Sequence, residues 1–171
     1  AMMDSFAVHF PSLCVVETIG VSEQGRLLLA ARISDNVAVQ EDEPELFYTS
    51  TMHGDETTGY VLMLRFIDSL LTAYGLDTGV TNFVNRVELH VNPLANPDGT
   101  YHGGNSTVAG ATRYNVNGVD LNRNFPDFNA GDHPDANPWQ SETIAMMNFA
   151  SLHSIVLSAN FHGGDEVVNY P

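Results

Sequence analysis

Apolar residues recur along this chain with two periods, one typical of helices and one typical of strands. From residue 56 to residue 74 they lie three and four apart, which predicts an amphipathic helix that ends at Gly75. Further helical segments are predicted over residues 140–154, with Ser141 as the cap, and over a short turn at residues 81–86. Short apolar runs bounded by turn residues predict five strands, over residues 12–20, 26–34, 46–52, 87–96 and 155–164.

The order of these elements predicts the fold class. The first two strands are joined by a short loop in which Gly25 supplies the turn, and the later strands alternate with helices. This order is typical of an α/β fold with a mixed, largely parallel sheet flanked by helices. In such sheets, ligands bind where loops leave the carboxyl ends of the strands. The opening AMMDSF is expected to be a cloning remnant that precedes the fold.

Composition excludes several classes of partner. The chain has 171 residues and a net charge of −15, with 21 acidic residues against six arginines. This balance argues against binding to nucleic acid or to an anionic membrane surface. No apolar stretch approaches the length of a membrane span. A single cysteine, Cys14, lies in an apolar run, so we expect a buried thiol and no disulfide within the chain.

One histidine lies where a predicted strand gives way to a helix. His53 follows the strand at 46–52, and Glu56 opens the helix, so both side chains can meet at one edge of the sheet. Zinc accepts imidazole nitrogen and carboxylate oxygen, and catalytic zinc sites use three protein ligands. A third ligand should come from a distant element, and His162, at the end of the last predicted strand, is the natural candidate. A simple capping role for Glu56 is the alternative.

The other histidines are assigned structural positions. His90 lies between apolar residues within a predicted strand, which indicates a core histidine whose polar atoms are satisfied. Four others fall in loops or on a helix face with no partner at ligand spacing: His9, His102, His133 and His153.

A long polar stretch, residues 97–139, is too long to be a simple connection and holds two of the six arginines. Arg113 and Arg123 lie ten residues apart, and arginine binds carboxylates in bidentate fashion and stabilises oxyanions. Asp120 could accept the remaining N–H of a ligand histidine. Salt bridging within the loop is the structural alternative for these residues.

Four motifs taken in order carry a family resemblance: HGDE, NPDG, TRYN…GVDLNRNFPD and NFHGG…VVNYP. Together they resemble the zinc metallocarboxypeptidases related to carboxypeptidase A, and most of all the regulatory branch that includes carboxypeptidases D, E, M and N. The resemblance runs from about Phe10 to Pro171. It implies one zinc ion as cofactor and the carboxyl terminus of a peptide or protein as substrate.

The resemblance also implies a role for each matching residue. His53, Glu56 and His162 match the three zinc ligands, and Asp120 matches the carboxylate behind a ligand histidine. Arg113 matches the catalytic arginine that polarises the scissile carbonyl. The final two matches, Asn122 and Arg123, correspond to the pair that binds the terminal carboxylate of the substrate.

One part of the family pattern has no counterpart. The family's general base and its substrate-covering tyrosine lie well downstream of the third ligand, and the sequence stops nine residues after His162. Neither Asp165 nor Glu166 matches the base, and Tyr170 matches a structural Tyr-Pro. Residues 1–171 are therefore expected to form a single, partial catalytic domain, the amino-terminal part, with the sheet incomplete on its carboxyl-terminal side.

Two alternatives to a carboxypeptidase stay open. Related zinc deacylases or amidases, which act on acylated amino acids or cell-wall peptides, share the His-x-x-Glu, the Asn-Arg pair and the distant histidine. A catalytically silent module that binds zinc or peptides would also fit a chain without the base. The resemblance suggests a secreted or periplasmic location.

Overall fold

The computed structural model describes residues 2–164 and 166–169, and its centre is a five-stranded mixed sheet. The strand order is β1-β2-β4-β3-β5. The pair β1–β2 and the pair β2–β4 are antiparallel, whereas β3 lies parallel to both β4 and β5. The strand bounds are β1 Cys14–Val21, β2 Leu27–Ile33, β3 Glu45–Ser50, β4 Glu88–Asn92 and β5 Ile155–Phe161.

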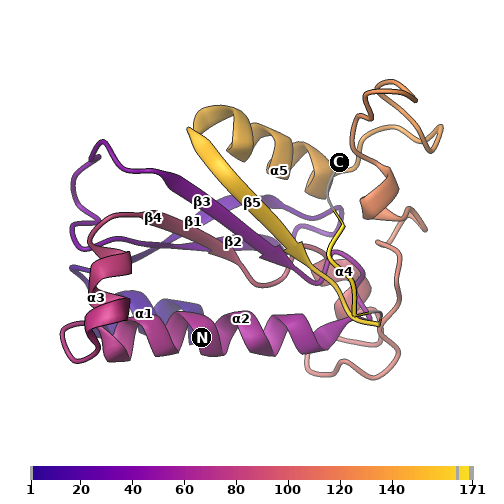
Figure 1. Ribbon diagram of the computed structural model, residues 1–171. Helices are drawn as coiled ribbons and strands as arrows, with labels where there is room; N and C mark the ends of the chain where they lie inside the picture. The colour runs from indigo at the N-terminus through magenta and orange to yellow at the C-terminus, as the bar shows by residue number, and fades with distance from the viewer. Residues whose placement is uncertain (1, 165, 170–171) are drawn as a thin grey trace.

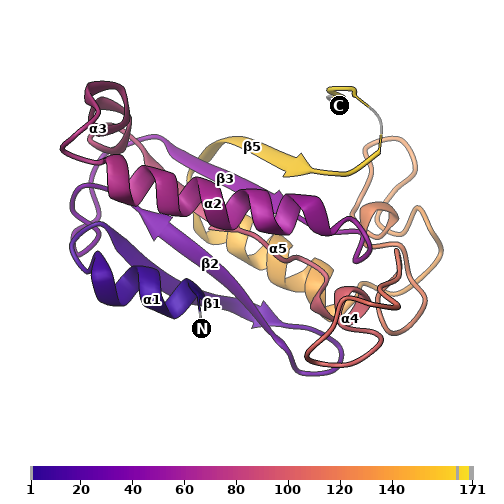
Figure 2. The same ribbon diagram turned by 90° about the horizontal axis from the view of Figure 1, so that it is seen from below.

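Helices cover both faces of this sheet (Figure 1). On one face lie α1 and the long α2, with α3 at one end, and Figure 2 shows these helices in front of the strands. On the other face lies α5. The helix bounds are α1 Met2–His9, α2 Thr57–Ala73, α3 Thr78–Val84, α4 Pro97–Thr100 and α5 Ser141–Leu152, with a 3₁₀ turn η1 at Leu121–Arg123. The predicted mixed α/β fold flanked by helices is confirmed.

Two apolar cores follow from these layers. The larger one lies between the sheet and α1 and α2, and includes the fully buried Ile67 and Leu89. The smaller one lies between the sheet and α5, where the rings of Phe47 and Phe149 are 4.8 Å apart. Side chains alternate between the faces of a strand, so Leu89 and its neighbour His90 point to opposite cores. The α5 face therefore receives the polar residues of β4.

Turn glycines were predicted correctly, but two predictions near helix starts were wrong. Gly25 and Gly75 have φ of +77° and +78°, a conformation that glycine adopts without strain. The opening segment is not a remnant outside the fold, because it forms α1 and its Met3 side chain is buried in the larger core. Ser141 is the first residue of α5 and not its cap, and its N–H donates to the Glu23 carboxylate at 2.7 Å.

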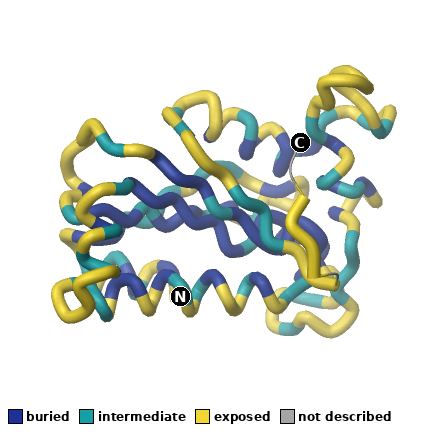
Figure 3. The backbone as a smooth tube through the Cα atoms, viewed as in Figure 1, coloured by how far each residue is buried: buried dark blue, intermediate teal, exposed yellow. Residues whose placement is uncertain are grey.

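The strand β5 lies at one edge of the sheet and is much more exposed than its neighbours (Figure 3). Val156 and Leu157 are exposed by 67% and 54%, whereas every residue of β4 is buried.

None of the helices in the described part of the chain is long and apolar enough to cross a membrane.

Candidate metal centre

The three predicted metal ligands lie together where β3 and β5 end. His53 follows β3, Glu56 immediately precedes α2, and His162 immediately follows β5. Because β3 and β5 are parallel neighbours, their carboxyl ends meet at the same edge of the sheet (Figure 1). The structure therefore brings together residues that are more than 100 positions apart in the sequence.

The backbone just before His53 is held in an unusual conformation. Thr51 has φ of +59°, a region that β-branched residues rarely occupy, and it is fully buried. Its hydroxyl donates to the carbonyl of Glu56 at 3.2 Å, which ties the end of β3 to the start of α2. This strained turn sets the direction in which the His53 side chain leaves the strand.

Gly54 allows the segment to pack tightly against α4. A Cβ atom on Gly54 would lie 2.4 Å from the Gly99 carbonyl carbon and 2.5 Å from the Thr100 nitrogen. The Thr100 hydroxyl donates to the Gly54 carbonyl at 2.8 Å. The NPDG motif forms α4 here, and the Asn96 side chain caps it by accepting from Gly99 N–H at 2.8 Å. The HGDE and NPDG motifs are therefore packed against each other.

The other two predicted ligands, Glu56 and His162, converge on Nδ1 of His53. Oε1 of Glu56 lies 2.8 Å from it, and Nδ1 of His162 lies 3.1 Å from it. The other carboxylate oxygen of Glu56 lies 2.9 Å from His162 Nδ1. Two imidazole nitrogens and a carboxylate are a donor set that fits zinc, and they leave a position open for a further ligand. We call these three residues the carboxyl-end cluster.

Asp120 lies behind this cluster, on the far side of the His53 ring. Its Oδ1 is 3.1 Å from His53 Nε2, and its Oδ2 accepts from two nitrogens of Arg113 at 2.9 Å each. A carboxylate in this position fixes the orientation of the ring and keeps Nδ1 directed at the other ligands. Arg113 Nη1 also lies 3.2 Å from His53 Nδ1, so the guanidinium borders the cluster directly.

Both carboxylates of this region are held in the ionised form. Burial alone would raise the pKa of Glu56, but a hydrogen bond from Gly163 N–H and contacts with His53 and His162 lower it overall. Burial likewise acts to raise the pKa of Asp120. There the Arg113 hydrogen bond and the nearby positive charge outweigh burial and lower it. Ionised carboxylates are the forms that bind a metal or support a ligand histidine.

Asn122 and Arg123 lie on the 3₁₀ turn that Asp120 caps. Asp120 accepts from the Asn122 N–H at 3.0 Å, so one carboxylate supports both His53 and this turn. The Arg123 side chain is exposed, and its Nη1 donates to the Asn122 carbonyl at 3.0 Å. This leaves a guanidinium with further donors at the surface, a group suited to an anionic partner.

Two contacts of the cluster were not predicted. Gly163 donates its backbone N–H to Glu56 Oε2 at 2.9 Å, and Asn160 Nδ2 lies 3.0 Å from His162 Nε2. The contact between Asn160 and His162 could have been predicted, because residues two positions apart in an extended segment point to the same side.

The acidic residues and the tyrosine that follow His162 were not assigned to the cluster from the sequence. Glu166 is exposed, and Asp165 and Tyr170 lie outside the described residues.

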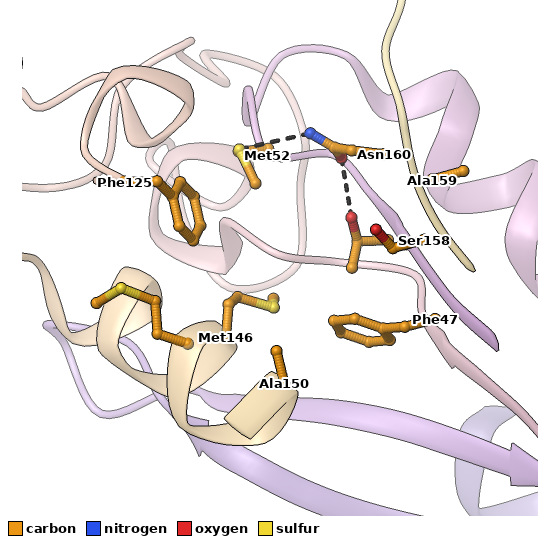
Figure 4. Close-up of a pocket in the computed structure, with 10 residues that line it drawn as sticks. Phe47, Met52, Phe125, Met146, Ala150, Ser158, Ala159 and Asn160 are labelled. Atoms are coloured by element: carbon orange, nitrogen blue, oxygen red, sulfur yellow. Dashed lines mark hydrogen bonds between the residues drawn. The ribbon is translucent and has the colours of Figure 1, made fainter. Parts of the chain in front are cut away.

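An apolar cavity of about 250 Å³ lies between α5 and the strands β3 and β5 (Figure 4). Phe47, Met52 and Met146 line it, and Asn160 spans its edge with hydrogen bonds to Thr49 and to the Met52 sulfur. Asn160 therefore contacts both this cavity and His162 of the carboxyl-end cluster.

Two histidines lie where the sequence predicted, but their surroundings were not predicted. His153 has a partner, since its Nδ1 lies 2.7 Å from Glu45 Oε2. His90 is fully buried, as predicted, but neither of its ring nitrogens makes a hydrogen bond within the described residues. Burial, and next the charge of His153, lower the pKa of His90 to about 4. His90 and His153 lie close to Glu45 and Glu88. No local motif indicated this arrangement, because the four residues come from three separate segments.

Comparisons with known proteins identify the family of the chain. A family model described as zinc carboxypeptidase matches residues 1–171. Carboxypeptidase D from Rattus norvegicus is 42% identical over 170 residues, which cover 97% of this chain and 12% of that protein. Carboxypeptidase M from Mus musculus is 35% identical over 181 residues, which cover the whole chain and 38% of that protein. The chain therefore spans well under half the length of these relatives.

The comparison with solved structures supports the fold. The crystal structure of carboxypeptidase A from Helicoverpa armigera superposes with a TM-score of 0.78, at 22% identity. The match covers 95% of this chain and 44% of that one. The predicted resemblance and the predicted fold class are both confirmed.

Proposed function

This chain belongs to the zinc carboxypeptidase family, and we propose that residues 1–171 form the zinc-binding part of a catalytic domain that hydrolyses the last peptide bond of peptides or proteins. The observation that carries the proposal is the convergence of Glu56 and His162 on Nδ1 of His53, with Asp120 behind the ring. We assign one zinc ion to these three ligands. A secreted or periplasmic location, suggested by the resemblance, is part of the same proposal.

The donor set supports zinc in particular. Imidazole nitrogens and a single carboxylate suit a borderline metal, and a three-ligand protein site is typical of catalytic zinc. When bound, the metal lowers the pKa of a water molecule and polarises a carbonyl oxygen. The residues of this chain fix the ligands in place: Thr51 and Gly54 set the turn before Glu56, and Asp120 orients the His53 ring.

The arginines supply recognition of the substrate. We propose that Arg113 stabilises the oxyanion, since its guanidinium borders the cluster and is 38% exposed. We propose that Asn122 and the exposed Arg123 bind the terminal carboxylate. A fixed carboxylate places only the last peptide bond at the cluster, which makes the activity that of an exopeptidase. The acidic chain favours cationic peptides electrostatically.

Mass spectrometry of a mixed peptide library, incubated with the chain and zinc, tests the activity. Stepwise loss of single carboxyl-terminal residues, blocked by a chelator, is the expected result. Cleavage within peptides, or release of acyl groups in preference to amino acids, would contradict the proposal.

A binding experiment tests recognition of the terminal carboxylate separately from hydrolysis. We expect the zinc-loaded chain to bind a peptide with a free carboxyl terminus more tightly than its amidated form. Arg123→Ala should remove that difference, whereas Arg86→Ala should keep it, since this exposed arginine lies just before the amino end of β4. Equal binding of both peptides, together with no hydrolysis, would overturn the assignment.

A further inference from the structure

A second group of histidines and carboxylates lies at the amino ends of the parallel strands. Glu45 is the first residue of β3, Glu88 is the first of β4 and His90 lies two positions later. His153 lies between α5 and β5. Glu45 pairs with Glu88, and their side chains share the face of the sheet that α5 covers. We call these four residues the amino-end cluster.

Close contacts connect the four side chains. Oε2 of Glu45 lies 2.7 Å from His153 Nδ1 and 3.5 Å from His90 Nε2. Oε1 of Glu88 lies 3.0 Å from the same His90 nitrogen. Each residue offers one ligand atom such that all four atoms lie within 4.8 Å of one another.

His90 is the member that internal contacts do not explain. Its side chain is fully buried, and neither ring nitrogen forms a hydrogen bond of acceptable geometry within the described part of the chain. The same is true of Glu88 Oε1, although it is close to His90 Nε2. A neutral imidazole needs one donor and one acceptor, and unpaired buried polar atoms are costly. A cation between His90 Nε2 and Glu88 Oε1 would accept a lone pair from each of these two atoms.

The arrangement fits a small, closed metal site. Zinc bonds to nitrogen and oxygen are about 2.0–2.2 Å long, so tetrahedral ligands lie about 3.3–3.6 Å apart. Of the three close contacts, the 3.5 Å contact lies within this range and those of 2.7 and 3.0 Å are shorter, and all four ligand atoms lie within 4.8 Å of one another. Four protein ligands with no open position are typical of a structural site, whereas the carboxyl-end cluster offers three.

The surrounding charges are compatible with a divalent cation. Arg32 of β2 lies opposite His90 in the sheet, and its Nη1 is 3.8 Å from Glu88 Oε2. Its Nε is 3.0 Å from Glu17 on β1, which offsets part of its charge. Ser154 N–H donates to Glu45 Oε1 at 3.3 Å. These groups engage the oxygens of Glu88 and Glu45 that face away from His90, as supporting partners of metal ligands do.

We propose that Glu45, Glu88, His90 and His153 bind a second transition-metal ion such as zinc. This ion joins the start of β3 to the start of β4 and to the junction of α5 with β5. It lies at the opposite end of the strands from the carboxyl-end cluster, and its role is structural. Access is past His153, whose side chain is 21% exposed, whereas the other three members are nearly or fully buried.

Metal counting in a chain that lacks the first site tests this proposal. The chain carrying His53→Ala is stripped with a chelator, reloaded with zinc and desalted, and its zinc is measured by mass spectrometry. One zinc per chain is expected. Adding His153→Gln should remove it, and Co²⁺ in place of zinc should show tetrahedral visible absorption bands only while His153 is present. Adding His133→Ala, an exposed loop histidine, should leave the zinc in place.

A second variant protects the test against failure to fold. Glu88→Gln keeps the size of a buried side chain and should weaken zinc binding at least tenfold in the same background. Circular dichroism of each variant verifies the fold. Absence of zinc from the folded His53→Ala chain would overturn the proposal. So would unchanged zinc content after both His153→Gln and Glu88→Gln.

Discussion

The carboxyl and amino ends of the parallel strands each carry histidines and glutamates, in contrasting settings. At the carboxyl ends, the ligands leave the strands on turns, and His162 is exposed to solvent. At the amino ends, Glu45, Glu88 and His90 lie within the strands and are buried. An open cluster with three ligands is suited to a substrate, whereas a closed cluster with four is suited to holding secondary structure together. We therefore propose that the same donor chemistry supports two roles, and that its position in the sheet decides between them.

The largest effect is expected from removal of the central ligand of the carboxyl-end cluster. His53→Ala should weaken zinc binding there by more than about 100-fold, because even supporting partners of ligands contribute about 10- to 100-fold. A competition titration against a chromophoric chelator measures this. His102→Ala, at an exposed loop histidine, is the matched control. If both variants bound zinc equally, His53 would not be a ligand.

Gly54→Ala should disturb the carboxyl-end cluster through the backbone. The new methyl group meets backbone atoms of Gly99 and Thr100 at 2.4 and 2.5 Å, so we expect a loss of about 3 kcal/mol in the free energy of unfolding. Urea denaturation measures the change. Gly163 lies next to His162 of the same cluster. In Gly163→Ala the new methyl group meets its nearest atom, in Glu56, at 3.5 Å, so the loss in the free energy of unfolding should be much smaller. Equal losses would show that close packing at Gly54 is unimportant.

Asp120→Asn should have a smaller effect that is confined to the carboxyl-end cluster. The amide keeps the shape of the side chain but removes the charge that faces His53 and Arg113. Zinc affinity there should fall by about 10- to 100-fold, while zinc at the amino-end cluster should be unchanged. Titrations of this variant with and without His153→Gln separate the two sites. An equal loss at both clusters would indicate a general effect on folding.

Glu166→Gln should have the smallest effect. This glutamate is exposed, and no carboxylate contact joins it to His53, Glu56 or His162 among the described residues. Any hydrolysis by the chain should therefore change less than about twofold, a difference of about 0.4 kcal/mol. A loss of hydrolysis with zinc still bound would identify Glu166 as a general base.

The contrast between the clusters also explains what the sequence could predict. His53 and Glu56 are three residues apart at a strand-to-helix junction, which periodicity located, and their ligand chemistry was enough to propose them as a pair. His162 could be added because parallel strands end at a common edge. The roles of Arg113 and Arg123 depended on the family resemblance, since spacing alone also allowed simple salt bridging.

The amino-end cluster could not be predicted in the same way. Its members come from three segments, and their meeting depends on the strand order and on the register of β3 with β4. The alternation of apolar and polar residues along a strand predicts neither the strand order nor the register. The opening helix was missed for a related reason, because a segment of eight residues gives too short a pattern to separate a helix from an unstructured end.

Anomalous diffraction at the zinc edge, from crystals of the chain grown with zinc, would locate the metal. We expect a peak bounded by His53 Nδ1, the Glu56 carboxylate and His162 Nδ1, about 2.0–2.2 Å from each. We also expect a second peak among Glu45, Glu88, His90 and His153. Zinc-loaded crystals with no peak at the carboxyl-end cluster would contradict the assignment of that cluster as the metal centre.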